Sequence, residues 1–361
     1  MRPVAEVIIQ QSVNSFRRDI VSVAVVNWNR RDLTRACLRS LAAQQGVEFE
    51  VVVVDNGSED GSAEMVESEF GRDGAYPLRL IRNRENRGFC AANNQAIAEC
   101  RGEFIALLNN DAEAEPGWLA ALRGAFDGRA EVGMAASKIL VHEDPSRIDK
   151  AGHLIYLDGQ NRGRGSGQKD HGQFDRVEEV LWPDGCAAMY RRSLLEETGG
   201  FDEDFFAYGD DAELGLRARI AGWKCLYVPT AVVRHRRAST LGLVSGRRLE
   251  LIERNRVLLA AKLFPWSLLW LNGPFYLARL GAGLWAAARN KGEVGQFPGM
   301  RGKWLLAKSL MKGDLQALAM LPRMLGKRRQ IERIRKLTPR QVSQLLLRHR
   351  ISLRELMEQS V

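Results

Sequence analysis

Between residues 20 and 108, short apolar segments alternate with segments of helical periodicity. The apolar segments are rich in β-branched residues and are bounded by turn residues, which is typical of buried strands. They span Ile20–Val26, Glu50–Val54, Leu78–Ile81 and Glu103–Leu108. The intervening segments, with apolar residues at spacings of three and four, are Asp32–Gln45, Ser62–Phe70 and Phe89–Cys100. This alternation predicts a doubly wound α/β sheet with mostly parallel strands.

Each of the four predicted strands is followed by polar residues. These are "NWNR" after the first strand, "DNGSEDGS" after the second, "RNRENRG" after the third and "NNDAE" after the fourth. Asn, Asp, Gly and Ser are common turn and cap residues, so any one of these segments has an ordinary structural explanation. The carboxyl ends of parallel strands, however, meet at the edge of the sheet where ligands bind. The joint occurrence of the four segments therefore favours a binding site.

The glycine-rich phosphate-binding motifs of two common nucleotide folds are absent. No GxGxxG follows the first strand, and GxxxxGK[ST] occurs nowhere in the chain. Those loops hold phosphates with backbone amides. The chain is therefore predicted to be neither a Rossmann dinucleotide enzyme nor a P-loop NTPase.

After Val141 the alternation lapses into a long segment, residues 142–180, that is rich in Gly, Asp and Arg. A polar insertion of this length predicts a functional lid or a disordered loop. Order is expected to resume with a helix over Asp211–Ala221 and a strand over Cys225–His235. The acidic start of that helix, "GDDAE", has an ordinary explanation, because carboxylates stabilise a helix N-terminus by roughly 0.3–1 kcal/mol each.

The five cysteines are odd in number, show no CxxC spacing and lie mostly in apolar segments. This pattern favours buried free thiols in a reducing compartment over disulfides. The first twenty residues lack the continuous apolar region of a secretory signal. We therefore expect a cytoplasmic protein.

The C-terminal third differs from the rest of the chain in charge. Residues 246–361 contain 23 Lys and Arg against 7 Asp and Glu, a net charge of +16, whereas the remainder has a net charge of −7. Residues 263–278 are apolar and uncharged, but they are too few to span a bilayer and include Pro265 and Pro274. An interfacial or re-entrant segment is therefore favoured over a membrane span.

Basic residues near an anionic leaflet contribute roughly 1 kcal/mol each, so this region predicts peripheral attachment to the inner face of the cell membrane. A helical face carries Trp304, Ala307, Met311, Leu315 and Leu318, with lysines beside it. A helix packed on a catalytic domain has the same pattern, and the sequence leaves both alternatives open. No nucleic-acid-binding motif accompanies the basic segment, so nucleic acid is not an expected partner.

Six motifs between Val21 and Thr240 resemble, in order and spacing, those of family 2 glycosyltransferases. The motifs are "VVNWNR", "VVVVDNGSEDGS", "ENRGFCAANNQAI", "LLNNDAEAEPGWL", "GGFDEDFFAYGDDAELGLRARIAGW" and "VPTAVVRH". They are most similar to the bacterial rhamnosyltransferase-like branch, which builds surface polysaccharides. The resemblance implies the GT-A fold and an inverting transfer from a nucleotide-sugar donor to a lipid-linked or cell-surface glycan. It also implies a divalent cation, Mg²⁺ or Mn²⁺.

Together with the charge distribution, the resemblance predicts a division of the chain into parts. An N-terminal extension, 1–19, precedes a catalytic domain, 20–245, and a basic helical region, 246–361, that associates with the membrane. Within the catalytic domain, residues 20–140 correspond to the nucleotide-sugar half and residues 141–245 to the acceptor half.

By the same resemblance, several polar residues are assigned to the donor. Asp55 matches the residue that recognises the nucleobase, and the segment from Asn27 to Asn29 matches the base and ribose site. Asn86, Gly88 and Asn94 match positions near the ribose and the diphosphate.

The metal motif of the family, of the DxD type, matches "NND" with its last acid at Asp111. Asn109 occupies the first position, where the family has an acid, so Glu113 is a candidate to share the task. His235 matches the histidine that completes the cation's protein ligands in metal-dependent relatives. The other histidines, His142, His153, His171 and His349, have no such match and are expected at the surface.

The family's "ED" motif matches "DDAE" and assigns the general base to Asp211. Asp210 and Glu213 are conservative replacements within the same motif and are assigned to the acceptor side. An unperturbed Asp, with a pKa near 3.9, is ionised at neutral pH and is able to accept the proton of an acceptor hydroxyl.

Two other classes of protein are alternatives. The replacements at Asn109 and in "DDAE" are compatible with a nucleotide-sugar-binding subunit of low catalytic activity in a polysaccharide assembly complex. A nucleotidyltransferase has a similar sheet, but it needs a Gly/Arg/Lys loop for the triphosphate after the first strand, and "NWNRRD" is a poor version of that loop.

Overall fold

The valine-rich segments form parallel strands at the centre of a sheet. The computed structural model describes residues 6–8, 16–71, 74–237, 245–288, 297 and 299–358. Strands β2 (Arg17–Asn27), β3 (Phe49–Asp55), β4 (Leu78–Arg82) and β5 (Gly102–Leu108) run parallel to one another. Their carboxyl ends therefore meet at one edge, as predicted. Most of the predicted extension 1–19 and the end of the resemblance at 238–240 lie outside the described residues.

The full sheet has the strand order β1-β4-β3-β2-β5-β12-β7-β13-β11. The other strands of this path are β1 (Glu6–Ile8), β7 (Val132–Val141), β11 (Glu178–Val180), β12 (Ala187–Arg191) and β13 (Lys224–His235). Strand β13 runs parallel to β7, whereas β12 is antiparallel to both β5 and β7. Two short strands, β6 (Ala112–Ala114) and β8 (Ile148–Lys150), pair with β13 and β7. The sheet is mixed but mostly parallel along its long strands, which confirms the predicted class.

Helices cover both faces of the sheet. Successive residues of β2 alternate between two apolar clusters, with Val23 and Val25 in one and Ala24 in the other. The Val23 cluster includes side chains of α1 (Arg31–Ala42), α2 (Ser62–Phe70) and α4 (Trp118–Gly124). The Ala24 cluster includes side chains of α3 (Phe89–Glu99), α5 (Arg192–Thr198) and α6 (Asp210–Ile220). A strand that is buried on both faces reads as a continuous apolar run, which is why the valine segments were recognisable.

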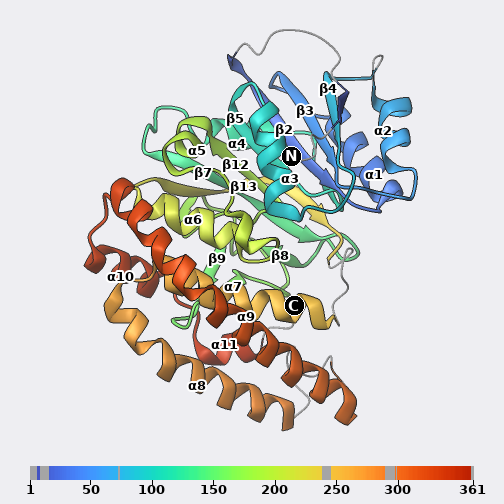
Figure 1. Ribbon diagram of the computed structural model, residues 1–361. Coiled ribbons are helices and arrows are strands. Elements are labelled where there is room, and N and C mark those ends of the chain that lie inside the picture. Colours follow the sequence, from blue (N-terminus) through green and yellow to red (C-terminus); the bar gives the residue numbers. More distant parts are fainter. Residues whose placement is uncertain are drawn as a thin grey trace.

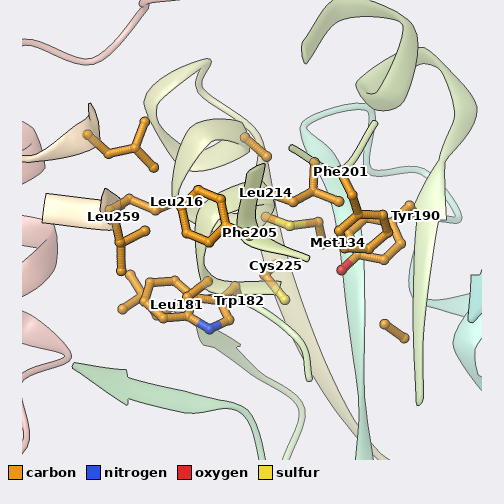
Figure 2. Packing of buried hydrophobic residues seen from close by; sticks show 14 of the residues in the cluster. Met134, Leu181, Trp182, Tyr190, Phe201, Phe205, Leu214, Leu216, Cys225 and Leu259 are labelled. Carbon is orange, nitrogen blue, oxygen red and sulfur yellow. The ribbon is translucent and has the colours of Figure 1, made fainter. Parts of the chain in front are cut away.

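Aromatic packing positions the start of α6. Figure 2 shows Trp182 and Phe205 packed together with Leu214 and Leu216 of this helix. A Cβ added to Gly215 would lie 2.2 Å from the Trp182 Cβ, so the helix backbone approaches the indole side chain as closely as glycine allows. This contact holds the acidic first turn of α6 in a defined place relative to the sheet.

The polar insertion is ordered, so the expectation of a disordered loop is wrong. It contains β8, β11 and a two-stranded sheet of β9 (His153–Ile155) and β10 (Asn161–Gly163). Ile148, Ala151 and Ile155 are fully buried. These few apolar residues pack into the core and hold the segment in place, although Gly, Asp and Arg dominate its composition.

In the part of the chain that the structure describes, five helices follow the sheet and lie together beside it, yellow-orange to red in Figure 1. They are α7 (Gly246–Leu263), α8 (Trp266–Ala288), α9 (Gly299–Ile334), α10 (Pro339–Arg348) and α11 (Leu353–Glu358). The Asn255 amide of α7 donates hydrogen bonds to the carbonyls of Phe205, Ala207 and Tyr208 at 2.9, 2.9 and 2.6 Å. These bonds join α7 to the loop that precedes α6. Among the described residues, no helix combines the length and the apolar character needed to cross a membrane.

Helix α9 does not pack on the molecule through the apolar face predicted from the sequence. Its buried residues include Ser309, Gly313 and Ala317, which lie on a different face. The side chains of Trp304 and Leu318 remain 64% and 57% exposed. The helix is therefore attached to the molecule while its apolar face stays largely uncovered.

The five cysteines are all buried and none forms a disulfide. Burial raises the pKa of each thiol above its usual value. The prediction of buried free thiols is therefore confirmed.

Candidate functional site

A cavity of about 1030 Å³ opens at the carboxyl edge of the parallel strands. Trp28 follows β2, Asn56 follows β3, Asn86 follows β4 and Asp111 follows β5, and all four line this cavity. The start of α6, the end of β13 and the helices α7 to α9 contribute the other walls. The predicted gathering of polar residues at one edge is thus observed.

Three residues assigned to the donor form a network behind the cavity wall. The Asn27 amide donates to Asp55 Oδ2 at 3.0 Å, and Asp55 Oδ1 accepts from a backbone amide of the next loop at 2.9 Å. Asn29 Oδ1 likewise accepts from a backbone amide at 2.7 Å. None of these three residues lines the cavity, whereas Trp28 and Asn56 do. The network therefore holds the loops from which Trp28 and Asn56 reach the cavity.

The alternation of side chains along extended backbone explains this arrangement. Asp55 points into the network, so its neighbour Asn56 points toward the cavity. The sequence patterns did not single out Asn56, although it adjoins a predicted residue, while Trp28 lies within the segment predicted for the base and ribose.

Asn86 and Gly88 line the cavity, but Asn94 does not. Asn86 Oδ1 accepts hydrogen bonds from the Asn56 amide and from the Gly88 backbone amide, both at 2.9 Å. Asn94 donates to the Phe201 carbonyl at 2.9 Å and accepts from the Phe201 amide at 2.8 Å. Asn94 therefore joins α3 to the loop before α6, and its amide is occupied there.

Gly88 adopts a backbone conformation, φ 85° and ψ 167°, that is almost restricted to glycine. A Cβ at this position would also lie 2.5 Å from the Phe206 ring. We expect Gly88→Ala to lower the free energy of unfolding by about 1–3 kcal/mol, measured by urea denaturation. Gly117→Ala is the matched control, because Gly117 precedes a helix at φ −95° and an added Cβ meets no atom within 4 Å. Equal losses in the two variants would contradict the assignment of strain to Gly88.

Asp111 and His235 face each other across the end of the sheet. Asp111 Oδ1 is buried, lies 3.4 Å from His235 Nε2 and accepts no hydrogen bond from a described residue. His235 Nδ1 is 2.7 Å from Asp149 Oδ2, and the other Asp149 oxygen is 2.6 Å from the Arg237 guanidinium. A buried oxygen without a partner and an imidazole oriented by a second carboxylate fit a divalent cation.

The charges around His235 also favour a cation at this place. Burial opposes protonation of the imidazole, but the Cys186 thiol, Asp111 and Asp149 raise the pKa of His235 well above its usual value. The neighbouring carboxylates therefore attract positive charge. A divalent cation would supply that charge in place of the proton, since a coordinating histidine must be neutral.

Asn109 and Glu113 have different surroundings. Asn109 lines the cavity, directly after β5. Glu113 lies in β6 and is not among the lining residues. Its Oε1 is 3.0 Å from His142 Nε2 and accepts from the Arg236 guanidinium at 3.2 Å. Glu113 is therefore already paired outside the cavity.

Asp211 belongs to a second cluster of charged residues that lines the cavity. His153 Nε2 is 2.8 Å from Asp184 Oδ2 and 3.5 Å from Asp211 Oδ2, and Lys150 Nζ is 2.5 Å from Asp184 Oδ2. The ligand atoms of His153, Asp184 and Asp211 lie within 4.8 Å of one another, so this cluster also has the composition of a metal site. Because the Lys150 ammonium already neutralises Asp184, we favour Asp111 and His235 for the cation.

The cluster perturbs the acidity of its members. Burial raises the pKa of Asp211, and Asp184 adds to this effect, while His153 and Lys150 oppose it. Burial also raises the pKa of Asp210 well above its usual value, with Asp211 as the next cause. For Asp184, burial is outweighed by Lys150 and His153, which lower the pKa well below its usual range. Asp211 is thus a stronger base than an exposed aspartate.

The neighbours of Asp211 in "DDAE" have separate environments. Asp210 lines the cavity, whereas Glu213 does not and is fully buried. Glu213 Oε2 accepts from the Arg217 guanidinium at 2.7 Å, and its Oε1 is 2.6 Å from Lys262 Nζ. Glu213 therefore joins α6 to α7.

His153 is only 4% exposed, so the expectation of a surface residue is wrong. Asp149, Lys150 and His153 all come from the insertion whose sequence predicted a lid or a loop. The contacts of Asp149 with His235, of Lys150 with Asp184, and of His153 with Asp184 and Asp211 join residues far apart in the chain, for which no local pattern exists.

Comparison with known proteins agrees with this geometry. The family described as Glycosyl transferase family 2 matches residues 22–199, and Glycosyl transferase family group 2 matches residues 160–287. An uncharacterised protein of Mycobacterium tuberculosis is 30% identical over 256 residues, which cover 68% of this chain and 76% of the relative. The N-acetylglucosaminyl-diphospho-decaprenol L-rhamnosyltransferase of the same species is 27% identical over 245 residues, 62% of this chain and 78% of the relative.

Solved structures share the fold. TarS of S. aureus, in complex with UDP-GlcNAc, matches with a TM-score of 0.54 and 17% identity, over 87% of this chain and 90% of TarS. The mannosyltransferase of Pyrobaculum calidifontis, in complex with GDP-Man and Mn²⁺, matches with a TM-score of 0.51 and 19% identity, over 84% of this chain and 88% of the other. The chain therefore belongs to glycosyltransferase family 2, in its rhamnosyltransferase-like branch, and is a glycosyltransferase with the GT-A fold.

Proposed function

We propose that the enzyme transfers a sugar, with inversion, from a nucleotide-sugar donor to a hydroxyl of a lipid-linked or cell-surface glycan. The observation that carries this proposal is the pairing within one cavity of a buried aspartate, Asp211, with an unpartnered Asp111 oxygen beside His235. The first provides a base for the acceptor and the second a place for the cation that accompanies the diphosphate. The division into a donor half (20–140), an acceptor half (141–245) and a membrane-associating region (246–361) is part of the proposal.

Asp111 and His235 would hold Mg²⁺ or Mn²⁺, and Asp149 would orient the imidazole. When bound, the cation supplies Lewis-acid stabilisation of the charge that develops on the leaving diphosphate. An imidazole ligand favours Mn²⁺ over Mg²⁺. Trp28 and Asn56, which line the cavity, would contact the nucleoside, and Asn27, Asn29 and Asp55 would support them.

Asp211 would accept the proton of the acceptor hydroxyl. The hydroxyl oxygen forms a bond to the anomeric carbon of the donor sugar while the bond from that carbon to the nucleoside diphosphate breaks. Since a carboxylate is a weak base for a hydroxyl, the proton moves late, as the acidity of the attacking oxygen rises. One displacement at the anomeric carbon inverts its configuration, and no covalent enzyme intermediate is needed.

The C-terminal helices support a cytoplasmic enzyme that is attached to the inner face of the membrane. Trp270 of α8 is 82% exposed, and Met300 and Trp304 of α9 are 84% and 64% exposed. Lysines flank this apolar surface, and Lys308 Nζ lies 5.2 Å from the centre of the Trp304 ring. Apolar side chains beside basic ones are typical of a helix that lies at an anionic membrane surface.

Donor binding and turnover test the proposal together. In thermal unfolding with Mn²⁺ and dTDP-, UDP- or GDP-sugars, the true donor at 100 times its Kd is expected to raise the free energy of unfolding by about 2.7 kcal/mol. Nucleoside diphosphate release that rises on adding a glycan acceptor then identifies an enzyme. Donor binding without any release would instead favour the alternative, a binding subunit of low catalytic activity, for which Asn109 at the metal motif is the supporting observation.

A further inference from the structure

The cavity that contains Asp211 continues between α8 and α9. Residues from one face of each helix line it, because they recur at spacings of three and four. The apolar ones include Leu280, Gly283, Leu306, Leu310, Met311 and Leu315. A nucleotide sugar is polar throughout, so this apolar wall does not suit the donor. We call this part of the cavity the apolar channel.

The apolar channel opens at the surface of the molecule. Met311 and Leu315 line it, yet they are 61% and 60% exposed. Trp304 and Leu318, 64% and 57% exposed, continue the same apolar surface along α9. The mouth of the channel therefore lies on the surface that we propose faces the membrane.

Two cations line the cavity without an acidic partner. Arg248 and Lys303 form no salt bridge with any residue that the structure describes. The nearby Arg256 and Arg279 differ, because their guanidinium groups lie 2.6 and 2.8 Å from Glu253 Oε1. Arg248 and Lys303 thus offer positive charge to an anionic ligand, for which phosphate oxygens are strong hydrogen-bond acceptors.

We propose that the apolar channel binds the hydrocarbon chain of a long-chain lipid diphosphate that carries the acceptor sugar. Arg248 and Lys303 meet the diphosphate, and the sugar extends toward Asp211. The chain passes between α8 and α9 and leaves at Met311 and Leu315, where it remains in the membrane. This inference rests on the proposed function and adds to it the class of acceptor and the route of the chain.

Glycine substitutions in α8 provide the test. A Cβ added to Gly283 or to Gly281 meets no atom within 4 Å, but only Gly283 lines the channel. Gly283→Leu therefore fills the channel, and Gly281→Leu is the matched control on the outer side of the same helix. The probes are farnesyl diphosphate and isopentenyl diphosphate, which share a headgroup and differ in chain length. Titration calorimetry measures the Kd of each probe. Divalent cations are left out, so that the diphosphate cannot bind through a metal ion.

We expect the wild-type protein to bind farnesyl diphosphate more tightly than isopentenyl diphosphate. Gly283→Leu should weaken the binding of farnesyl diphosphate about tenfold, equivalent to roughly two fewer buried methylene groups, and leave isopentenyl diphosphate unchanged. Gly281→Leu should change neither. Equal binding of the two probes by the wild-type protein, or equal effects of the two variants, would overturn the proposal.

A second variant keeps the test decisive if Gly283→Leu does not fold. Leu315→Lys at the exposed mouth should also weaken the binding of farnesyl diphosphate and leave the binding of isopentenyl diphosphate unchanged. Equal effects of this variant on the two probes would overturn the proposal. Because these titrations need neither donor nor turnover, their result is separate from that of the proposed function. Chain-length-dependent binding in a protein that transfers no sugar would count against the transfer reaction alone.

Discussion

Asp211→Asn is expected to reduce the rate of sugar transfer by about 10²–10⁴-fold while donor binding is retained. The amide keeps the size of the side chain and an acceptor oxygen for one of the two backbone amides that donate to Asp211, but it cannot take the proton of the acceptor hydroxyl. Transfer is measured as nucleoside diphosphate release at saturating acceptor, and donor binding by thermal shift. Asp127→Asn is the matched control, because Asp127 is exposed and pairs with Arg123 at the surface. Unchanged transfer in Asp211→Asn would exclude Asp211 as the base.

The raised pKa of Asp211 gives this prediction a pH dependence. Transfer needs the carboxylate, so the rate should fall as the pH falls through a pKa above the usual 3.8. The same group has the opposite effect on stability. Because its folded pKa exceeds its unfolded pKa, its contribution to stability is present at low pH and is lost as the pH rises through the folded value. Asp211→Asn should therefore be at least as stable as the wild type at pH 7, which thermal unfolding checks.

Asp111→Asn is expected to weaken the Mn²⁺-dependent binding of the donor by at least about 100-fold. Residues that only support a metal ligand typically change metal affinity by 10–100-fold, and a ligand itself should change it by more. The variant keeps the volume of the side chain and removes the charge of the unpartnered oxygen. Titration of the donor with and without Mn²⁺ measures the effect, and loss only in the presence of Mn²⁺ separates it from general damage.

Two further variants define the metal site. Asp149→Asn, which alters the partner of the His235 imidazole, should give an intermediate loss of about 10–100-fold. Glu113→Gln should have no effect on Mn²⁺-dependent binding, because Glu113 is paired with His142 and Arg236. Retention of Mn²⁺-dependent binding in Asp111→Asn together with its loss in Glu113→Gln would move the metal site from Asp111 to Glu113.

Much of the fold was predictable because it depends on local patterns. The runs from Ile20 to Val26 and from Glu50 to Val54 are strands buried on both faces, so their apolar character is continuous. The polar residues after them had to meet, since parallel strands share one carboxyl edge. The helical periodicity around Met311 and Leu315 predicted an apolar face on α9, but the sequence left open whether that face packs on the catalytic domain. In the structure, Met311 and Leu315 of this face line the channel, whereas Trp304 and Leu318 do not and remain exposed.

The sequence by itself determined the sheet, its ligand edge and the family, because periodicity and ordered motifs are properties of neighbouring residues. Only the tertiary structure decided which charged side chains share a buried space. Lys150 and His153 lie in a segment without regular periodicity, and they reach Asp184 and Asp211 only through the packing of that segment on the sheet. The basicity of Asp211 depends on these neighbours and on burial. Both arise from contacts between residues that are far apart in the chain, which no local pattern encodes.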